Sequence, residues 1–292
     1  MSIALATKFA PYTDEVFKAE SKRTLLTNTD FDWTGAHTVK IWKISTASLN
    51  DYTRAPGNDD TNFSRYGAIT DLNAQVEEMV LSKDRSFIFN IDKLDEDETA
   101  GQVEGGKALA REIREVVIPE VDAYTYGKMV SGAGTTAEAV EITSVNIYNL
   151  ITTATATLDE AEVPETDRVL VVTPAVYSIL KGVVTFDHTD VGAEMRALGV
   201  VAYMDGMAVV KVPASRLPSG FGFMVAHPSA TVAPIKLEDY GLHSDTVISS
   251  GTIVTGRIAY DAFVLDNKAN GIYYQPEPVD DDEDDESDGD GT

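Results

Sequence analysis

The sequence predicts an α+β fold, and three features of the chain point to it. A long amphipathic segment, 98–130, has the periodicity of a helix. Segments rich in β-branched and aromatic residues lie before this helix and return in the last quarter of the chain. Helical and strand-like segments alternate in the region between, 141–231. Together these features favour sheets that each pack against a few helices.

The composition indicates a soluble protein made in a cytosol. The 292 residues are enough for about two ordinary domains. No apolar run approaches the roughly 20 residues that a membrane helix needs. Lys8 follows the short N-terminal apolar stretch, which is not the order of a signal peptide. The chain has no cysteine, which excludes disulfides, thiolate metal sites and cysteine nucleophiles.

The chain is strongly acidic, with a formal charge of −25. Nine acidic residues lie in the tail, 280–292, which we expect to be disordered and solvated. The remaining 39 acidic and 23 basic residues still give −16, so the field of the body opposes general binding of nucleic acid. The candidates for a local basic face lie near the N-terminus and are Lys8, Lys18, Lys22 and Arg23.

Two N-terminal segments lack the apolar surface of a compact domain. Residues 1–35 have a weak helical pattern and are predicted to form an arm. Residues 36–95 are predicted to form an extended loop whose strands are His37–Ile44, Val76–Leu81 and Ser86–Ile91. A ribbon without a covering helix is marginally stable in water. It must therefore fold back on the chain or be covered by another chain, and its long polar tip favours the second.

One long helix is expected from Gly101 to Met129. Arg111 and Glu115 lie off its apolar face and should face solvent or a neighbour. Pro119 cannot donate to the carbonyl of Glu115, so a kink is expected there. The apolar stripe should pack on the strands that return late in the chain. Its residues are Leu109, Ile113, Val116, Val117, Val121 and Tyr124.

The alternating region begins with a helix predicted within Ser144–Pro164. A buried strand follows within Asp167–Val172. Thr173 then supplies an N-cap oxygen, and Pro174 supplies the first position of a short helix that Gly182 should end.

The clearest local pattern in the chain is a hairpin. Two β-rich runs in Gly199–Pro213 flank Asp205 and Gly206, which form the dipeptide of a two-residue primed turn. From 232 to 279 the chain returns to strands, and the last two are joined by the turn Asp266–Gly271.

A glycine-rich segment, Gly132–Ala137, has the glycine spacing of a dinucleotide-binding loop. Such a loop follows a strand and opens a helix. Here the long helix comes first, which favours a flexible connector.

No convincing active site emerges from the sequence. Asp187, His188 and Asp190 lie close together, but a metal site needs further ligands and none has a recognisable spacing. No G-x-S-x-G motif supports a Ser–His–Asp triad. The tail resembles a calcium loop that lacks its closing glutamate. We therefore predict no catalytic, cofactor-binding or metal-binding residue, no cofactor and no enzyme activity.

The order of these parts resembles the major capsid proteins of tailed bacteriophages, the Hong Kong 97-type fold. The resemblance covers residues 1–275. His37–Ile91 is similar to the extended loop of that family, and Gly101–Met129 is similar to its spine helix. Gly199–Pro213 is similar to a hairpin of the axial domain. Gly251–Tyr274 is similar to the closing strands of the peripheral domain, with a Tyr-Asp pair and a K-x-x-G-I return.

The resemblance implies a structural protein that assembles as hexamers and pentamers into an icosahedral shell around double-stranded DNA. The implied partners are copies of itself, scaffold and portal proteins, and the DNA through weak non-specific contacts, without a membrane. The implied location is the virion, after synthesis in the cytoplasm of a host bacterium. The implied parts are an arm (1–35), an extended loop (36–95), a peripheral domain with the spine helix (96–140), an axial domain (141–231), peripheral return strands (232–279) and the tail (280–292).

Two other functions stay open at this point. An encapsulin-like bacterial compartment would have the same fold and enclose a cargo enzyme. A cytosolic α/β enzyme would use Gly132–Ala137 as a phosphate loop and would be a monomer or a small oligomer.

Overall fold

The computed structural model contains two units. The smaller is the stretch Trp33–Leu81, and the larger holds the rest of the chain. The described residues are 21–28, 38–44, 47–52, 54, 65–66, 71, 74–94, 105–183, 200–244 and 249–278.

The smaller unit contains a two-stranded antiparallel ribbon of β1 (Thr38–Ile44) and β2 (Ala74–Val80). Opposite charges meet across it. Lys40 lies directly opposite Glu78, with 3.7 Å between Nζ and Oε2, and Lys43 Nζ lies 2.9 Å from Oε2 of Glu77. Such cross-strand pairs contribute about 0.2–1 kcal/mol each, so they help set the register but cannot replace a hydrophobic core.

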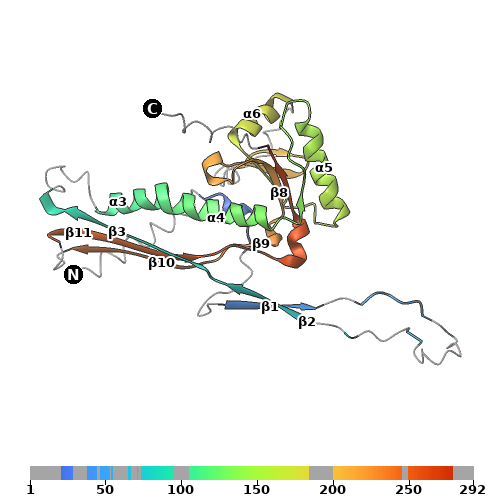
Figure 1. Ribbon diagram of the computed structural model, residues 1–292, viewed down its shortest axis with the longest axis horizontal. Helices are drawn as coiled ribbons and strands as arrows, with labels where there is room; N and C mark the ends of the chain where they lie inside the picture. The colour runs from blue at the N-terminus through green and yellow to red at the C-terminus, as the bar shows by residue number, and fades with distance from the viewer. Residues whose placement is uncertain are drawn as a thin grey trace, which may run out of the picture. The chain divides into compact units, whose positions relative to one another are not determined.

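The larger unit contains a three-stranded antiparallel sheet in the order β10 (Ile235–Ser244), β11 (Gly251–Tyr260) and β3 (Lys83–Asp92). The long helix lies along this sheet (Figure 1). Alternate residues of β11 point at the helix, and Val254 and Ile258 are buried there. This half of the unit is therefore one helix packed on one sheet face.

The long helix is continuous from α3 (Gly105–Glu112) through a π-helical turn (Ile113–Val117) to α4 (Ile118–Ser131). The predicted stripe is largely confirmed, because Leu109, Ile113, Val117 and Val121 are buried against the sheet. Val116 is an exception at 47% exposure. The wider π turn rotates each residue through a smaller angle than an α turn, which carries Val116 away from the sheet.

The π turn also changes the interpretation of Pro119. The sequence predicted a kink at this residue; the helix continues through it, with a π-helical turn directly before it. A proline ring clashes with the carbonyl one α-turn earlier, and a π turn moves that carbonyl away. The clash is thus relieved by an extra residue in one turn.

The second half of the larger unit is a six-stranded mixed sheet. Its order is β4 (Thr135–Thr136), β13 (Ile272–Pro276), β8 (Phe221–Ala226), β5 (Val169–Val172), β7 (Met207–Lys211) and β6 (Val200–Met204). The pairs β5–β7 and β4–β13 are parallel, and the other pairs are antiparallel. Every residue of β5 and β8 is buried, as expected for central strands covered on both faces.

Different elements cover the two faces of this sheet. On one face, α5 (Ile147–Glu160) and α6 (Pro174–Val183) pack on Leu170, Val209 and Phe223 (Figure 1). On the other face, the C-terminal part of α4 and the segment 21–28 contribute buried apolar side chains. These are Tyr126 and Met129 from α4, and Leu26 from the N-terminal segment.

The remaining elements are short. The strands β9 (Thr231–Val232) and β12 (Phe263–Val264) form a small antiparallel pair. Four 3₁₀ turns complete the described part: η1 (Arg23–Leu25), η3 (Ala214–Arg216), η4 (Pro228–Ala230) and η5 (Asp266–Gly271).

Local predictions in the alternating region are mostly confirmed. Asp205 and Gly206 have φ of 51° and 75°, as the primed hairpin turn requires. Thr173 Oγ1 accepts a hydrogen bond from the amide of Val176 at 3.2 Å, which makes it the N-cap of α6. The prediction that Gly182 ends this helix is wrong, because α6 continues to Val183 and Gly182 does not adopt a positive φ.

Two strands lie elsewhere than the sequence placed them. β3 falls in the predicted extended loop, 36–95, but the structure pairs it with β11 in the larger unit. β13 falls in the predicted peripheral strands, 232–279, but it enters the six-stranded sheet between β4 and β8. In both places the partner strand is remote in sequence, and its hydrogen bonds decide the placement.

The helix-on-sheet packing can be tested with one pair of substitutions. Ile113→Ala should lower the free energy of unfolding by about 2–5 kcal/mol, because it leaves a cavity against the sheet. Val116→Ala, three residues along the helix, should change it by less than about 0.5 kcal/mol, because its side chain is half exposed. Urea unfolding followed by circular dichroism measures both. An equal decrease in the free energy of unfolding for the two variants would contradict the placement of Ile113 against the sheet and of Val116 away from it.

Candidate assembly surfaces

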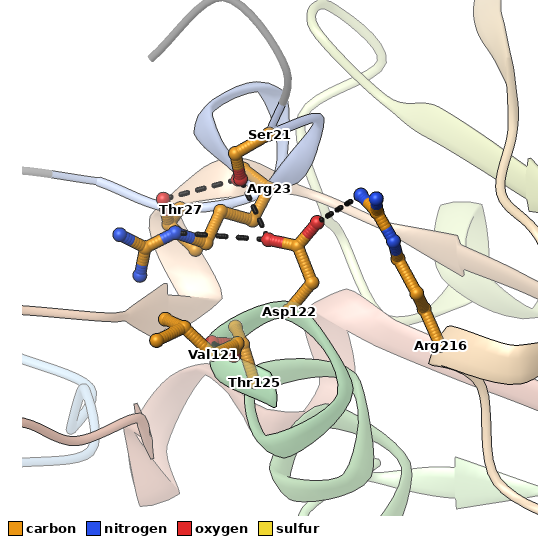
Figure 2. Close-up of polar contacts among 7 residues, drawn as sticks. All are labelled: Ser21, Arg23, Thr27, Val121, Asp122, Thr125 and Arg216. Atoms are coloured by element: carbon orange, nitrogen blue, oxygen red, sulfur yellow. Dashed lines mark hydrogen bonds and ion pairs between the residues drawn. The ribbon is translucent and has the colours of Figure 1, made fainter. Parts of the chain in front are cut away.

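A buried carboxylate joins three parts of the larger unit. Asp122 of α4 is 1% exposed. Its Oδ1 accepts a hydrogen bond from Ser21 Oγ at 2.6 Å, and its Oδ2 accepts one from Arg216 Nη1 at 2.9 Å. Arg23 Nε lies 4.0 Å from Oδ1. Figure 2 shows these side chains converging from the N-terminal segment, α4 and η3, and we name Ser21, Arg23, Asp122 and Arg216 the Asp122 cluster.

Burial dominates the electrostatics of the Asp122 cluster. Burial raises the pKa of Asp122, against the lowering by the Ser21 hydrogen bond and by the charges of Arg23 and Arg216. Burial also lowers the pKa of Arg23, against the charge of Asp122. Each charge is tolerated inside because the other is present, so loss of one partner leaves an uncompensated charge. The cluster therefore fixes the segment 21–28 to the long helix.

The segment 21–28 is held at its other end as well. The amide of Asn28 donates to the carbonyl of Thr231 at 2.9 Å, and its Nδ2 donates to the carbonyl of Ser229 at 3.1 Å. Leu26 between them is fully buried. This part of the predicted arm thus belongs to the larger unit, while 1–20 and 29–37 lie outside the described residues.

A second buried carboxylate links the three-stranded sheet to the long helix. Asp261 follows β11 and is 3% exposed. It accepts hydrogen bonds from the amide and the hydroxyl of Ser82, at 2.7 and 2.8 Å, and from the Tyr124 hydroxyl at 2.8 Å. It is the aspartate of the Tyr-Asp pair in the sequence. Its contacts join the start of β3 and the long helix to the end of β11.

The loop of the smaller unit exposes apolar side chains. Leu49 is fully exposed, and Tyr52 and Tyr66 are 52% and 77% exposed. The two tyrosine rings meet edge to face with 5.1 Å between their centroids. Solvent-exposed aromatic clusters of this kind are typical of surfaces that contact another protein.

The larger unit has exposed apolar side chains of its own. Ile88 on β3 is 71% exposed, on the sheet face away from the helix. Val145 and Tyr148, near the start of α5, are 86% and 51% exposed. These residues lie on different elements, so the chain offers several separate candidate contact surfaces.

The glycine-rich segment does not have the geometry of a phosphate loop. It follows α4 and leads into the short strand β4, without a helix after it. The amides of Gly132, Gly134 and Ala137 donate to the carbonyls of Lys128, Ala269 and Tyr274 at 2.9 Å each. Because these amides are already used within the fold, they cannot cradle a phosphate. The segment is a packed connector.

The four histidines and the two aspartates near His188 were the candidate metal ligands, and only two of these residues lie in the described part of the chain. His37, His188, Asp187 and Asp190 lie outside the described residues. His227 caps η4, where its Nδ1 accepts from the amide of Ser229 at 3.2 Å, and His243 Nε2 lies 3.1 Å from Thr255 Oγ1. Among the described residues, no three His, Asp or Glu side chains come together as a metal site would require. Within the same residues, every helix is too short or too polar to span a membrane.

The whole arrangement can be compared with solved structures. The capsid structure of the Cyanophage P-SCSP1u aligns with a TM-score of 0.65 and 14% identity over 88% of this chain and 87% of that chain. A structure from Mycobacterium phage Che8 aligns with a TM-score of 0.62 and 18% identity over 87% and 90%. The chain has the Hong Kong 97-type capsid fold of tailed bacteriophages.

The same capsid fold matches a particle of another source. A virus-like particle from Pyrococcus furiosus aligns with a TM-score of 0.56 and 11% identity, over 94% of this chain and 98% of that chain. Neither a family model nor a curated protein matches the chain. The similarity to these solved structures is therefore a similarity of fold.

The Asp122 cluster gives a proteolysis test. Asp122→Ala should lower the free energy of unfolding by about 3–5 kcal/mol, because it leaves the Arg23 charge buried without its carboxylate. Trypsin should then cut after Arg23 in the variant and not in the parent protein. Ser21→Ala removes one hydrogen bond and should cost only about 1 kcal/mol. If Arg23 in the Asp122→Ala variant stays as resistant to trypsin as in the parent protein, Asp122 does not hold the segment 21–28 in place.

The packed connector gives a second test. A Cβ on Gly134 would lie 2.5 Å from the backbone of Ala269, whereas a Cβ on Gly127 of α4 would meet nothing within 4 Å. Gly134→Ala should therefore lower the midpoint of thermal unfolding. Gly127→Ala should raise the stability by up to about 1 kcal/mol, because alanine favours the helix. Differential scanning calorimetry measures both. If Gly134→Ala leaves the midpoint of thermal unfolding unchanged, Gly134 is not packed tightly against the backbone of Ala269.

Proposed function

We propose that this chain is the major capsid protein of a tailed bacteriophage. The observation that carries the proposal is the match of nearly the whole chain to nearly the whole of several phage capsid chains. A similarity of that extent spans most of both chains. It does not stop at a single common motif such as a helix packed on a sheet.

The proposed assembly is an icosahedral shell of hexamers and pentamers that encloses double-stranded DNA. In this shell the ribbon, 36–81, lies on a neighbouring subunit. Its exposed Leu49, Tyr52 and Tyr66 support this proposal, because interfaces are enriched in aromatic residues and gain free energy from buried apolar area. The six-stranded half would form the axial domain, and the helix-on-sheet half the peripheral domain.

Further proposed partners are a scaffold protein, a portal protein and the packaged DNA. Contacts with DNA would be weak and non-specific, because the body of the chain carries a net negative charge. We assign the chain no catalytic role, no cofactor and no metal. We propose that it is synthesised in the cytoplasm of a host bacterium and ends in the virion.

A second candidate is an encapsulin-like compartment that encloses a protein cargo. The similarity to the virus-like particle from Pyrococcus furiosus favours it, because that match covers more of both chains than the phage matches do. The higher TM-scores of the phage structures favour the capsid. The enzyme alternative loses its support, because the amides of Gly132 and Gly134 are used within the fold.

Particle formation and particle content test the proposal together. The purified chain, alone or with a co-expressed scaffold, should elute as megadalton particles and show closed shells by negative-stain microscopy. Particles isolated from infected cells should contain nuclease-protected double-stranded DNA. A protein cargo without DNA would instead identify the compartment. Small oligomers under all salt and protein concentrations would exclude both shells.

The ribbon surface has its own prediction. The double variant Leu49→Asp, Tyr66→Asp should abolish particle assembly, because it places charges in an apolar contact. The fold of the larger unit should remain, with an unchanged circular dichroism spectrum. The matched control is Ser48→Asp, Asn50→Asp, which adds the same charge to the same loop. Sedimentation velocity measures assembly. If both variants assemble equally, the exposed apolar side chains are not part of the contact.

A further inference from the structure

One histidine caps the turn to which the end of the segment 21–28 is bonded. His227 directly precedes η4, and its Nδ1 accepts a hydrogen bond from the amide of Ser229 at 3.2 Å. The hydroxyl of Ser229 lies 2.7 Å from the same nitrogen. The carbonyl of Ser229 accepts from Asn28 Nδ2 at 3.1 Å, and the carbonyl of Thr231, directly after η4, accepts from the amide of Asn28 at 2.9 Å. We name His227, Ser229, Thr231 and Asn28 the His227 anchor.

These hydrogen bonds require a neutral imidazole ring. A neutral ring has one donor nitrogen and one acceptor nitrogen, whereas a protonated ring has two donors. Nδ1 of His227 must be the acceptor, because the amide of Ser229 can only donate. Protonation of Nδ1 would place a second donor against this amide. The cap of η4 would then be lost, and with it the support of the two carbonyls that hold Asn28.

The surroundings of His227 favour the neutral ring. Burial lowers its pKa most, and the charges of Arg168 and Lys268 lower it further. The charge of Asp167 and a hydrogen bond to the backbone of Thr166 act in the opposite direction. These charged groups face the ring from the residues before β5 and from η5, while η4 itself carries no charge. A histidine with a lowered pKa stabilises the fold above its ordinary pKa of about 6.5, and this contribution is lost as the pH falls below that value.

We propose that the His227 anchor is a pH-sensitive hold on the N-terminal segment, in which protonation of the ring uncaps η4 and loosens Asn28 from Ser229 and Thr231. The other end of the segment is held by Asp122 through Ser21, so acid should loosen the end at Asn28 first. The proposal holds whether or not the chain forms a shell. In a shell, each subunit would hold its segment 21–28 less firmly in acid than at neutral pH.

Hydrogen exchange of the full-length chain, followed by mass spectrometry, tests the proposal. It is measured at about pH 7.5 and at about pH 5, the two sides of the range in which histidine titrates. Each rate is divided by the intrinsic rate at that pH, which gives the protection of peptides that contain the amides of Asn28 and Ser229. In the parent protein this protection should fall about threefold to tenfold in acid, the effect of losing one hydrogen bond. A peptide that contains β7 should keep its protection, because β7 lies inside the six-stranded sheet.

Three histidine variants identify the titrating group. His227→Asn keeps an N-cap residue and has no titratable side chain, so the acid-dependent fall at Ser229 should disappear. His227→Ala removes the cap, so the protection at Ser229 should be low already at neutral pH and should not fall further. The matched control is His243→Asn on β10, which removes the other described histidine and should respond to acid as the parent does.

Asp122 is the competing source of acid sensitivity on the same segment. Burial raises its pKa, so its contacts with Ser21 and Arg23 also weaken in acid. Asp122 is unchanged in all three variants. If His227→Asn loses as much protection in acid at Ser229 as the parent does, the proposal is overturned, because the response then arises from another group. Unchanged protection of the parent at both pH values overturns it too.

Discussion

The three-stranded and the six-stranded sheet of the larger unit are each covered on one face by the same continuous helix. A sheet with a bare apolar face is not stable in water, and among the described residues no other α-helix packs on these two sheet faces. The first part of the helix covers the three-stranded sheet through Leu109, Ile113 and Val121. Its last part covers one face of the six-stranded sheet through Tyr126 and Met129. These two of the three hydrophobic cores therefore share one helix.

This shared helix explains why polar side chains are buried in it. Asp122 lies between the residues that serve the two cores, where an apolar residue would be expected. Its carboxylate binds the segment 21–28 and η3 to the helix. Tyr124, two residues further along the helix, binds Asp261 at the end of β11. Directional bonds of this kind fix how each sheet is oriented on the helix, which apolar contact alone specifies poorly.

Features with a local signal could be predicted from the sequence, and features that depend on remote partners could not. The stripe of Leu109 and Ile113 follows from helical periodicity, and the hairpin at Asp205 follows from turn chemistry. The Asp122 cluster joins residues about a hundred positions apart, so no spacing rule finds it. The one available signal was an aspartate within an apolar helical pattern. The connector at Gly132–Ala137 shows that glycine spacing predicts little without the flanking strand and helix.

The position of β13 in the sheet order has a consequence for the timing of folding during synthesis. This strand, Ile272–Pro276, is almost the last described part of the chain, yet it lies inside the six-stranded sheet between β4 and β8. On the ribosome, the sheet remains open at that position until the strand has left the exit tunnel. A truncated chain cannot complete its core. A chain that ends before Ile272 therefore lacks one strand of this sheet.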